Sequence, residues 1–283
     1  WRYEQSKENN ILNQWVAAIK AAGIKKIEGS VISDDSTFGT STIPTGWIWQ
    51  DIGNYYGAGS GSICWRENQF DIQLKAGASV GEPAEIVKTI PQTPYIQLVN
   101  ELKTGVSGTG DNAYGFLAPY SNIGYLRGTW GMGIKKTGIS LAIPDAAFDA
   151  AYRLQDTLKR LSIECGKNAS STRLLALEHK KIGNEQKPLL SIFSPTLSQI
   201  VYWFNKKSIN LYGEQLLKTI AYKQGKEGNT RNGANTTINF WAGRGIDKNA
   251  LNMIDGSGLS PGNRVTTLAM ASILFQAQKE EWF

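Results

Sequence analysis

The residues with the clearest chemical potential form the short pattern Ser208-Ile209-Asn210. Two lysines precede Ser208, and apolar residues follow it at the spacing of a helix, so we expect Ser208 to be a helix N-cap. A hydroxyl and a carboxamide held at the start of a helix can grip a polar substrate. By itself, the pattern also fits an ordinary cap beside a solvated asparagine. The expected apolar face consists of Ile209, Tyr212, Gly213, Leu216 and Ile220.

Any serine chemistry in this chain needs a base other than histidine. His179 is the only histidine, and its charged neighbours indicate a solvated position, which argues against both a Ser-His-Asp triad and a His-rich metal site. A Ser-x-x-Lys pair would supply a nucleophile and a lysine base, but no serine here is followed three positions later by lysine. Two Lys-Thr-Gly triplets, 103–105 and 136–138, both precede Ser208, and we interpret them as a turn and a strand.

The composition is typical of a folded protein with two or three compact units. Of 283 residues, 41% are apolar and 19% are charged, which argues against a disordered chain. The net charge of +6 favours a polyanionic environment, which could be nucleic acid, anionic lipid or a cell-wall polymer. No Lys/Arg run exceeds two residues, so no dedicated nucleic-acid patch is visible, and no stretch has the length of a membrane span. Cys64 and Cys165 are expected as small buried hydrophobes, and their pairing stays open.

Helical and strand patterns divide the chain. Helical periodicity over 10–22 precedes a strand at 26–33, and a strand at 134–143 precedes a helix from 144 to 161. Between these α+β segments, the alternating patterns predict mostly strands, which indicates one domain inserted into another. We therefore expect an α+β domain at 1–75 and 134–185, with a strand within 69–74, and a nested β domain at 76–133 with strands within 95–100, 114–117 and 124–127.

The last third of the chain reads as mostly helical. Polar residues near 184–188 indicate a domain boundary, and we assign 186–283 to a separate, largely helical portion. Helices are expected from 195 into the segment that contains Ser208, at 236–242 and at 266–278.

Four segments occur in an order that is similar to a known enzyme family. They are 33–36 (Ser-Asp-Asp-Ser), the aromatic stretch 46–58, 207–217 around Ser208, and 253–260 (Met-Ile-Asp-Gly-Ser-Gly-Leu-Ser). Together they resemble the class C low-molecular-mass penicillin-binding proteins, which are D-Ala-D-Ala carboxypeptidases and endopeptidases of the bacterial cell wall. The resemblance implies an α+β fold. In it, a penicillin-recognising serine transpeptidase-like domain carries an inserted α+β domain, which itself carries a small all-β domain.

The resemblance also implies roles for individual residues. Ser208 would relay a proton to the leaving nitrogen, and Asn210 would bind the substrate's amide carbonyl. Trp47 and Tyr55 match aromatic positions that hold the side chain of the stem peptide, although such a cluster also fits ordinary packing. Gln50 stands where many relatives have an acidic residue, so recognition of a charged amine is not carried over.

The run 255–260 has both an ordinary and a functional interpretation. Asp-Gly and Ser-Gly pairs are common turn chemistry. In the family, this loop lies beside the catalytic cleft, and the position of a frequent substrate-binding arginine is Pro261 here, so no arginine contact is carried over. The resemblance places Leu259 at the substrate, and assigns to the cleft loop Asp255, Gly256, Ser257 and Gly258.

The implied reaction is acyl transfer. A serine attacks the carbonyl between the two terminal D-alanines of a stem peptide, D-alanine leaves, and water or an amine resolves the acyl-enzyme. The ligands would be peptidoglycan stem peptides and β-lactams, with no cofactor, no metal and no nucleic acid. In the family, Ser-x-x-Lys precedes the segment that begins here at Trp1, and the functional Lys-Thr-Gly lies beyond Phe283.

We therefore expect a central fragment, inactive by itself, of a secreted parent that acts in the periplasm or another extracytoplasmic space, with its signal peptide outside these residues. Two other hypotheses stay open. The parent could be a catalytically silent module that binds cell-wall peptides, or a nucleic-acid-binding protein, which rests on charge alone.

Overall fold

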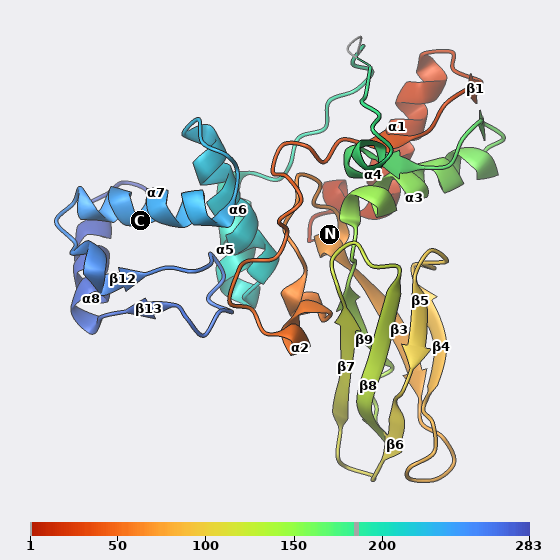
Figure 1. Ribbon diagram of the computed structural model, residues 1–283, viewed down its shortest axis with the longest axis horizontal. Helices are drawn as coiled ribbons and strands as arrows, with labels where there is room; N and C mark the ends of the chain where they lie inside the picture. The colour runs from red at the N-terminus through yellow and green to blue at the C-terminus, as the bar shows by residue number, and fades with distance from the viewer. Residues whose placement is uncertain (1, 184–186) are drawn as a thin grey trace.

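The computed structural model describes residues 2–183 and 187–283, whose arrangement is shown in Figure 1. Helices and strands are both present, so the expected mixture of α and β structure is confirmed. Figure 1 shows a helical C-terminal part on one side and, on the other, an N-terminal group of helices above an elongated β unit. The predicted boundary between 185 and 186 lies outside the described residues.

The N-terminal group packs two helices together with very short parallel strands. Helix α1 contacts α3, and the buried side chains of Val16, Leu158 and Ile163 form their common core. Helix α3 begins where Asp145 accepts a hydrogen bond from the Phe148 N–H, as an N-cap residue does. The predicted strand at 26–33 is broken into two pieces, each of which pairs in parallel with a later strand. The elements are α1 (Glu8–Ala21), β1 (Lys26–Ile27), β2 (Ile32–Ser33), α3 (Ala146–Arg160), β10 (Glu164–Cys165), β11 (Ser170–Ser171) and α4 (Thr172–Leu177).

The β unit consists of two small sheets around one apolar core. One sheet has the order β4-β3-β9, and in the other β8 pairs with β5, β6 and β7. Phe70, Leu126 and Leu141 are fully buried between the sheets, because alternate residues of each strand face inward. The strands are β3 (Gln69–Lys75), β4 (Glu85–Ile90), β5 (Gln97–Asn100), β6 (Lys103–Gly105), β7 (Asp111–Leu117), β8 (Ile123–Gly131) and β9 (Gly138–Ala142).

Three features of the β unit differ from the sequence-based expectations. The triplet 103–105 forms strand β6 and not a turn, because it pairs with β8. Strand β4 is unpredicted: it lies at a sheet edge, where its half-exposed residues give no clear alternation. Strands β3 and β9 lie outside the expected nested domain 76–133, but they pair with each other and contribute to the same core. The sheet and its core therefore continue across the positions 75 and 134.

The C-terminal part is built on four helices and one short hairpin. Helix α6 packs against both α5 and α7. The predicted helix at 236–242 begins earlier, at Thr230, where the Asn229 side chain caps it. Among the described residues, no helix is both long and apolar enough to cross a membrane. The elements are α5 (Leu197–Lys207), α6 (Asn210–Lys223), α7 (Thr230–Ala242), β12 (Leu251–Asn252), β13 (Arg264–Val265) and α8 (Thr267–Ala277).

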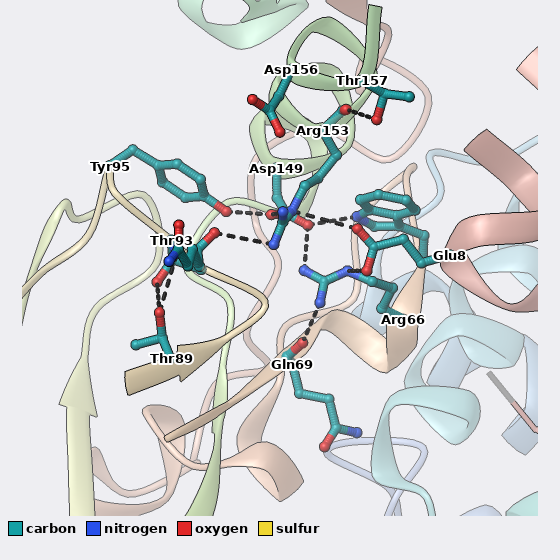
Figure 2. A network of polar contacts seen from close by, with 12 residues as sticks. Glu8, Arg66, Gln69, Thr89, Thr93, Tyr95, Asp149, Arg153, Asp156 and Thr157 are labelled. Atoms are coloured by element: carbon teal, nitrogen blue, oxygen red, sulfur yellow. Dashed lines mark hydrogen bonds and ion pairs between the residues drawn. The ribbon is translucent and has the colours of Figure 1, made fainter. Parts of the chain in front are cut away.

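A buried polar cluster joins the N-terminal group to the β unit (Figure 2). The fully buried Asp149 carboxylate of α3 accepts hydrogen bonds from Arg66 Nη2 at 2.7 Å and Trp65 Nε1 at 2.8 Å, and also from the Tyr95 hydroxyl. Glu8 lies 3.5 Å from both Arg66 Nε and Arg153 Nε. Hydrogen bonds and opposite charges therefore compensate these groups for the loss of water.

A left-handed turn holds one of the arginines of this cluster. Arg66, Glu67 and Asn68 have φ angles of 54°, 54° and 49°, which side chains other than glycine adopt at a cost of about 1 kcal/mol or more each. All three residues are buried and their side chains are bound: Arg66 to Asp149, Glu67 to Arg2, and Asn68 Nδ2 to Gly59 O at 2.9 Å. These contacts offset the cost of the backbone conformation. They direct the chain from the aromatic segment, residues 46–58, into β3.

Candidate functional site

The structure corrects the expected position of Ser208. Helix α5 continues through Lys207, and Ser208 is its C-cap, with a left-handed φ of 51°. The next helix, α6, begins at Asn210, and its N-cap is Ile209. The prediction of a Ser208 N-cap was wrong because the two lysines, which suit the negative end of a helix dipole, extend the preceding helix and do not precede a new one. Ser208 and Asn210 nevertheless lie together at the junction of two helices, and Ser208 is exposed.

The buried face of α6 is also rotated from the expected one. Ile220 is 41% exposed, while two charged side chains, Glu214 and Lys218, are 0% and 1% exposed. The hydrophobic pattern failed here because it treats charged residues as markers of the solvent face. The buried residues of α6 are Leu211, Gly213, Glu214, Leu217, Lys218 and Ala221.

Asn210 connects α6 to the aromatic segment. Its Nδ2 donates a hydrogen bond of 2.8 Å to the main-chain oxygen of Tyr56. Tyr56 belongs to the short 3-10 helix η2 (Tyr55–Gly57), which follows α2 (Trp49–Ile52). The structure thus joins two of the segments that the sequence singled out, although they are about 150 positions apart.

Glu214 connects α6 to the loop that begins at Asp255. Its Oε1 accepts hydrogen bonds of 2.9 Å from the backbone N–H groups of both Gly256 and Ser257. The two backbones are so close that a Cβ on Gly213 would lie 2.5 Å from the Gly256 oxygen. Burial raises the pKa of Glu214 to about 7, and the Asp255 charge raises it further. The hydrogen bonds that the Glu214 carboxylate accepts oppose this shift.

Asp255 organises the loop itself. Its carboxylate accepts hydrogen bonds from the N–H groups of Gly258 at 2.7 Å and Ser260 at 2.6 Å. It also accepts one from the Trp47 indole at 2.9 Å. The Trp47 ring is only 8% exposed, so this residue of the aromatic segment is fixed on the 255–260 loop. In the same loop, the half-buried Leu259 donates its N–H to Ser257 Oγ at 3.3 Å.

Lys218, one turn after Glu214, joins α6 to the chain on either side of the aromatic segment. Its ammonium donates hydrogen bonds of 2.7 Å and 2.6 Å to the main-chain oxygens of Ser41 and Ser60. Burial lowers its pKa to about 8, although the nearby Glu214 charge opposes this shift. Sequence reasoning missed both Glu214 and Lys218. The available signal was their spacing of four, which places them on one helix face with Leu211 and Leu217.

A further contact fixes α6 to the left-handed turn. The Tyr212 hydroxyl donates to Glu67 Oε1 at 3.0 Å, and Arg2 Nε lies 2.7 Å from the same oxygen. Burial, followed by the Glu67 charge, raises the pKa of Tyr212. The helix that carries Asn210 is therefore tied to the N-terminal group as well as to both neighbouring segments.

The remaining predicted residues lie at the surface of the aromatic segment. Tyr55 is 55% exposed, and its ring meets the Tyr56 ring edge-on at 5.3 Å. Gln50 is exposed at the start of this segment.

Asp35, from the Ser-Asp-Asp-Ser motif, accepts the Arg173 N–H at 3.0 Å near the start of α4. Asp35 is therefore engaged away from α6.

Two cavities lie elsewhere in the described part of the chain. One, of about 30 Å³, is bordered by Asp35 and Tyr120, and another, of about 550 Å³, lies between 73–77 and 130–137 in the β unit. Neither is lined by a predicted site residue. Cys64 and Cys165 are both free, and Cys64 is exposed and not buried as expected.

Comparisons with known proteins match this arrangement to one family. The D-Ala-D-Ala carboxypeptidase 3 (S13) family profile matches residues 5–283. The D-alanyl-D-alanine carboxypeptidase DacB of Haemophilus influenzae is 27% identical over 274 residues, which cover 94% of this chain and 54% of the relative. The D-alanyl-D-alanine carboxypeptidase of Actinomadura sp. (strain R39) is 25% identical over 285 residues, covering 96% and 50%.

Solved structures show the same fold. The crystal structure of penicillin binding protein 4 (dacB) from Haemophilus influenzae superimposes with a TM-score of 0.75 and 24% identity, covering 96% of this chain and 58% of that one. Its complex with a novel β-lactam gives a TM-score of 0.64 and 21% identity, covering 95% and 57%. This chain spans about half the length of the relatives it matches. The predicted resemblance to class C penicillin-binding proteins is confirmed, and the chain belongs to the D-Ala-D-Ala carboxypeptidase 3 (S13) family.

Proposed function

We propose that this chain forms part of a serine-type D-Ala-D-Ala carboxypeptidase or endopeptidase that acts on peptidoglycan stem peptides and is acylated by β-lactams. The observation that carries the proposal is the set of contacts around α6. Asn210 binds the aromatic segment through Tyr56 O, and Glu214 binds the loop through the N–H groups of Gly256 and Ser257. Three of the four segments with the family pattern therefore meet at one helix.

The geometry around Asn210 supports a specific role for its side chain. A carboxamide nitrogen carries two N–H groups, and the bond to Tyr56 O uses one of them and fixes the orientation of the side chain. The second N–H, with the side-chain oxygen, would bind the substrate's amide group. Ser208, exposed at the end of α5, would relay a proton to the leaving nitrogen.

The aromatic segment and the loop would bind the stem peptide. Tyr55 offers an exposed ring, and the neutral Gln50 side chain nearby can exchange hydrogen bonds but not charge. Trp47, held by Asp255, would act mainly by keeping this segment against the loop, and Leu259 would supply an apolar contact.

The nucleophile and its base would come from polypeptide outside these 283 residues. None of them forms a Ser-x-x-Lys pair, and both Lys-Thr-Gly triplets lie in or beside strands of the β unit, not beside α6. We assign to the residues here the positioning of the substrate and of the leaving group. The whole protein would act in the periplasm or another extracytoplasmic space, where peptidoglycan is found.

Fluorescent penicillin tests the proposal directly. The whole gene product should be labelled covalently, and Asn210→Ala should slow labelling about 100-fold, as removal of one positioned donor does. Asn249→Ala changes an exposed asparagine outside the α6 contacts and should leave the rate unchanged. Equal rates for the two variants would contradict the role of Asn210. Labelling of residues 1–283 alone would contradict the external nucleophile.

A catalytically silent module that binds stem peptides is the second candidate, because the contacts around α6 could hold a peptide without any nucleophile. The two functions differ in turnover. A whole protein that binds a D-Ala-D-Ala peptide without releasing D-alanine, and that takes no penicillin label, would support the silent module.

A further inference from the structure

A row of three aromatic rings, two exposed and one half-buried, runs from the aromatic segment onto the β unit. Phe116 of β7 and Tyr125 of β8 are direct cross-strand partners. Both side chains face outward, because their neighbours Leu117 and Leu126 point into the core. Trp49 of α2, which lies against β7 in Figure 1, extends the row, with its ring centroid 6.1 Å from that of Phe116.

Two rings of the row keep a large part of their surface in solvent. Trp49 is 50% exposed and Tyr125 is 37% exposed, although each could bury a large apolar area elsewhere. Exposed apolar surface that is contiguous, and not scattered, marks interaction sites in soluble proteins. We therefore expect the row to bind a partner that has flat apolar surfaces.

Arg127 and Glu101 form an ion pair beside the rings of the row. The Arg127 guanidinium lies over both rings, 5.2 Å from the Phe116 ring centroid and 4.9 Å from that of Tyr125. Its Nε is 2.6 Å from Glu101 Oε2. The pair is neutral overall and still offers hydrogen-bond donors and acceptors at the edge of the rings.

This combination selects among the possible partners. A single-stranded nucleic acid would require an excess of positive charge beside the stacking rings, which the Arg127–Glu101 pair does not provide. Pyranose rings have apolar C–H faces that can stack on aromatic rings, and hydroxyl groups that can bond to guanidinium and carboxylate. A neutral oligosaccharide therefore fits the row in both shape and charge.

The position of the row connects it to the candidate site. Trp49 is in the same segment as Tyr55 and as Tyr56, whose main-chain oxygen accepts the Asn210 hydrogen bond. Helix α2 contacts η2, and η2 contacts α6, so a polymer that lies along the row would end near α6. In peptidoglycan, the stem peptide is attached to a glycan strand, so one substrate molecule could occupy both surfaces.

We propose that Trp49, Phe116 and Tyr125 form a glycan-binding row that stacks on the hexosamine rings of the strand whose stem peptide enters the α6 site. The inference rests on the proposed function for its choice of glycan. The row adds a second, weaker contact that increases the affinity for polymeric substrate over that for free stem peptide.

The test uses residues 1–283 and a β-1,4-linked hexamer of N-acetylglucosamine, titrated by calorimetry and by NMR. We expect chemical-shift changes at the Trp49 indole and at the backbone of β7 and β8. Trp49→Ala and Tyr125→Ala should each weaken binding about tenfold, and Tyr125→Phe, which keeps the ring, should restore it to within about twofold. Phe193→Ala removes a ring that is 86% exposed outside the row and should leave the affinity unchanged.

Two results would overturn the inference: no shift at Trp49, β7 and β8 at millimolar hexamer, or equal affinities for wild type, Trp49→Ala and Tyr125→Ala. Thermal unfolding of each variant identifies any that does not fold, and the shift map of the wild-type chain decides the question without them. Failure of the proposed function looks different. Glycan binding at the row without penicillin labelling of the whole protein would contradict the peptidase and not the row. Penicillin labelling of the whole protein without glycan binding would contradict the row and not the peptidase.

Discussion

Two buried polar clusters hold this molecule together in different ways. In the Asp149 cluster, a fully buried carboxylate lies beside two arginines, and Glu8 adds a second negative charge. In α6, Glu214 and Lys218 are just as buried, but both bind main-chain groups of neighbouring segments. The first cluster joins charged side chains to one another, and its arginines also bind the main-chain oxygens of Gln69 and Gln92. The second joins a helix to two loops.

The two clusters are expected to do different things. The Asp149 cluster, called the joint below, fixes two parts of the fold together, and Glu214 and Lys218 position the segments around α6. Opposite charges compensate one another in the Asp149 cluster, so its contribution is to hold α3 against the left-handed turn and the β unit. Glu214 and Lys218 have pKa values shifted to about 7 and about 8, within the range where cells and cell envelopes vary in pH. The attachment of the loops to α6 is therefore expected to depend on pH.

The largest effect should come from Asp149→Ala. The change removes the nearer of the two carboxylates beside the buried Arg66 guanidinium and leaves only Glu8, at 3.5 Å, and the loss of a buried partner costs about 3 to 5 kcal/mol in the free energy of unfolding. Urea denaturation of the two proteins measures it. The control is Asp156→Ala on the same helix, which removes a more exposed pair with Arg160 and should cost less than about 1 kcal/mol. Equal costs would show that the Asp149 cluster is not a special joint.

Glu214 should make stability fall as pH rises. Its pKa is raised from 4.5 to about 7 in the fold, so its contribution is complete below about pH 4.5 and is lost as pH passes through about 7. The difference amounts to about 3 kcal/mol. Glu214→Gln keeps an oxygen that can accept from Gly256 and Ser257, and should remove this part of the pH dependence. Unfolding measured from pH 4 to 8 would contradict the account if the two curves ran parallel.

Lys218→Met should destabilise the chain by about 1 to 3 kcal/mol, because two buried main-chain oxygens lose their donor. Since the pKa of Lys218 is lowered from 10.5 to about 8, its contribution should fall as pH decreases from about 10.5 to about 8. Hydrogen exchange at 41–60 should also become faster. Lys223→Met, at the exposed end of the same helix, is the matched control and should change neither quantity.

The smallest effect should come from Tyr212→Phe. The loss of the hydroxyl removes one hydrogen bond to Glu67, which keeps its contacts with Arg2 and with Gln69 Nε2 at 3.1 Å, so we expect about 1 kcal/mol. Tyr202→Phe, on an exposed face of α5, should cost almost nothing. A cost above about 3 kcal/mol would mean that the contact belongs to the joint and does not merely orient α6.

Elements with a regular apolar period were predictable from the sequence. The helices at 8–21, 146–160, 197–207 and 267–277 follow the expected stripes, and β3 and β7 alternate as expected. The edge strand β4 and the strand at 103–105 were not predictable from the sequence, because their conformation depends on pairing with distant partners. Local preference does not carry that information.

The candidate site was predictable in its segments but not in its contacts. Asn210 and Asp255 belong to motifs that can be found in a sequence. Glu214 and Lys218 were missed because a charge on a helix is ordinarily solvated, and only the fold shows that their partners are main-chain groups. Ser208 was misassigned because a left-handed serine at a helix end lacks the usual glycine signal.

The most direct test of the account is a crystal structure of the whole protein acylated by a β-lactam. The central claim is that α6 brings Asn210, the 255–260 loop and the aromatic segment to one substrate. We predict the Asn210 side chain at about 3 Å from the amide group of the bound β-lactam, with Glu214 still on Gly256 and Ser257. A β-lactam bound away from Asn210, with α6 outside the site, would contradict the account.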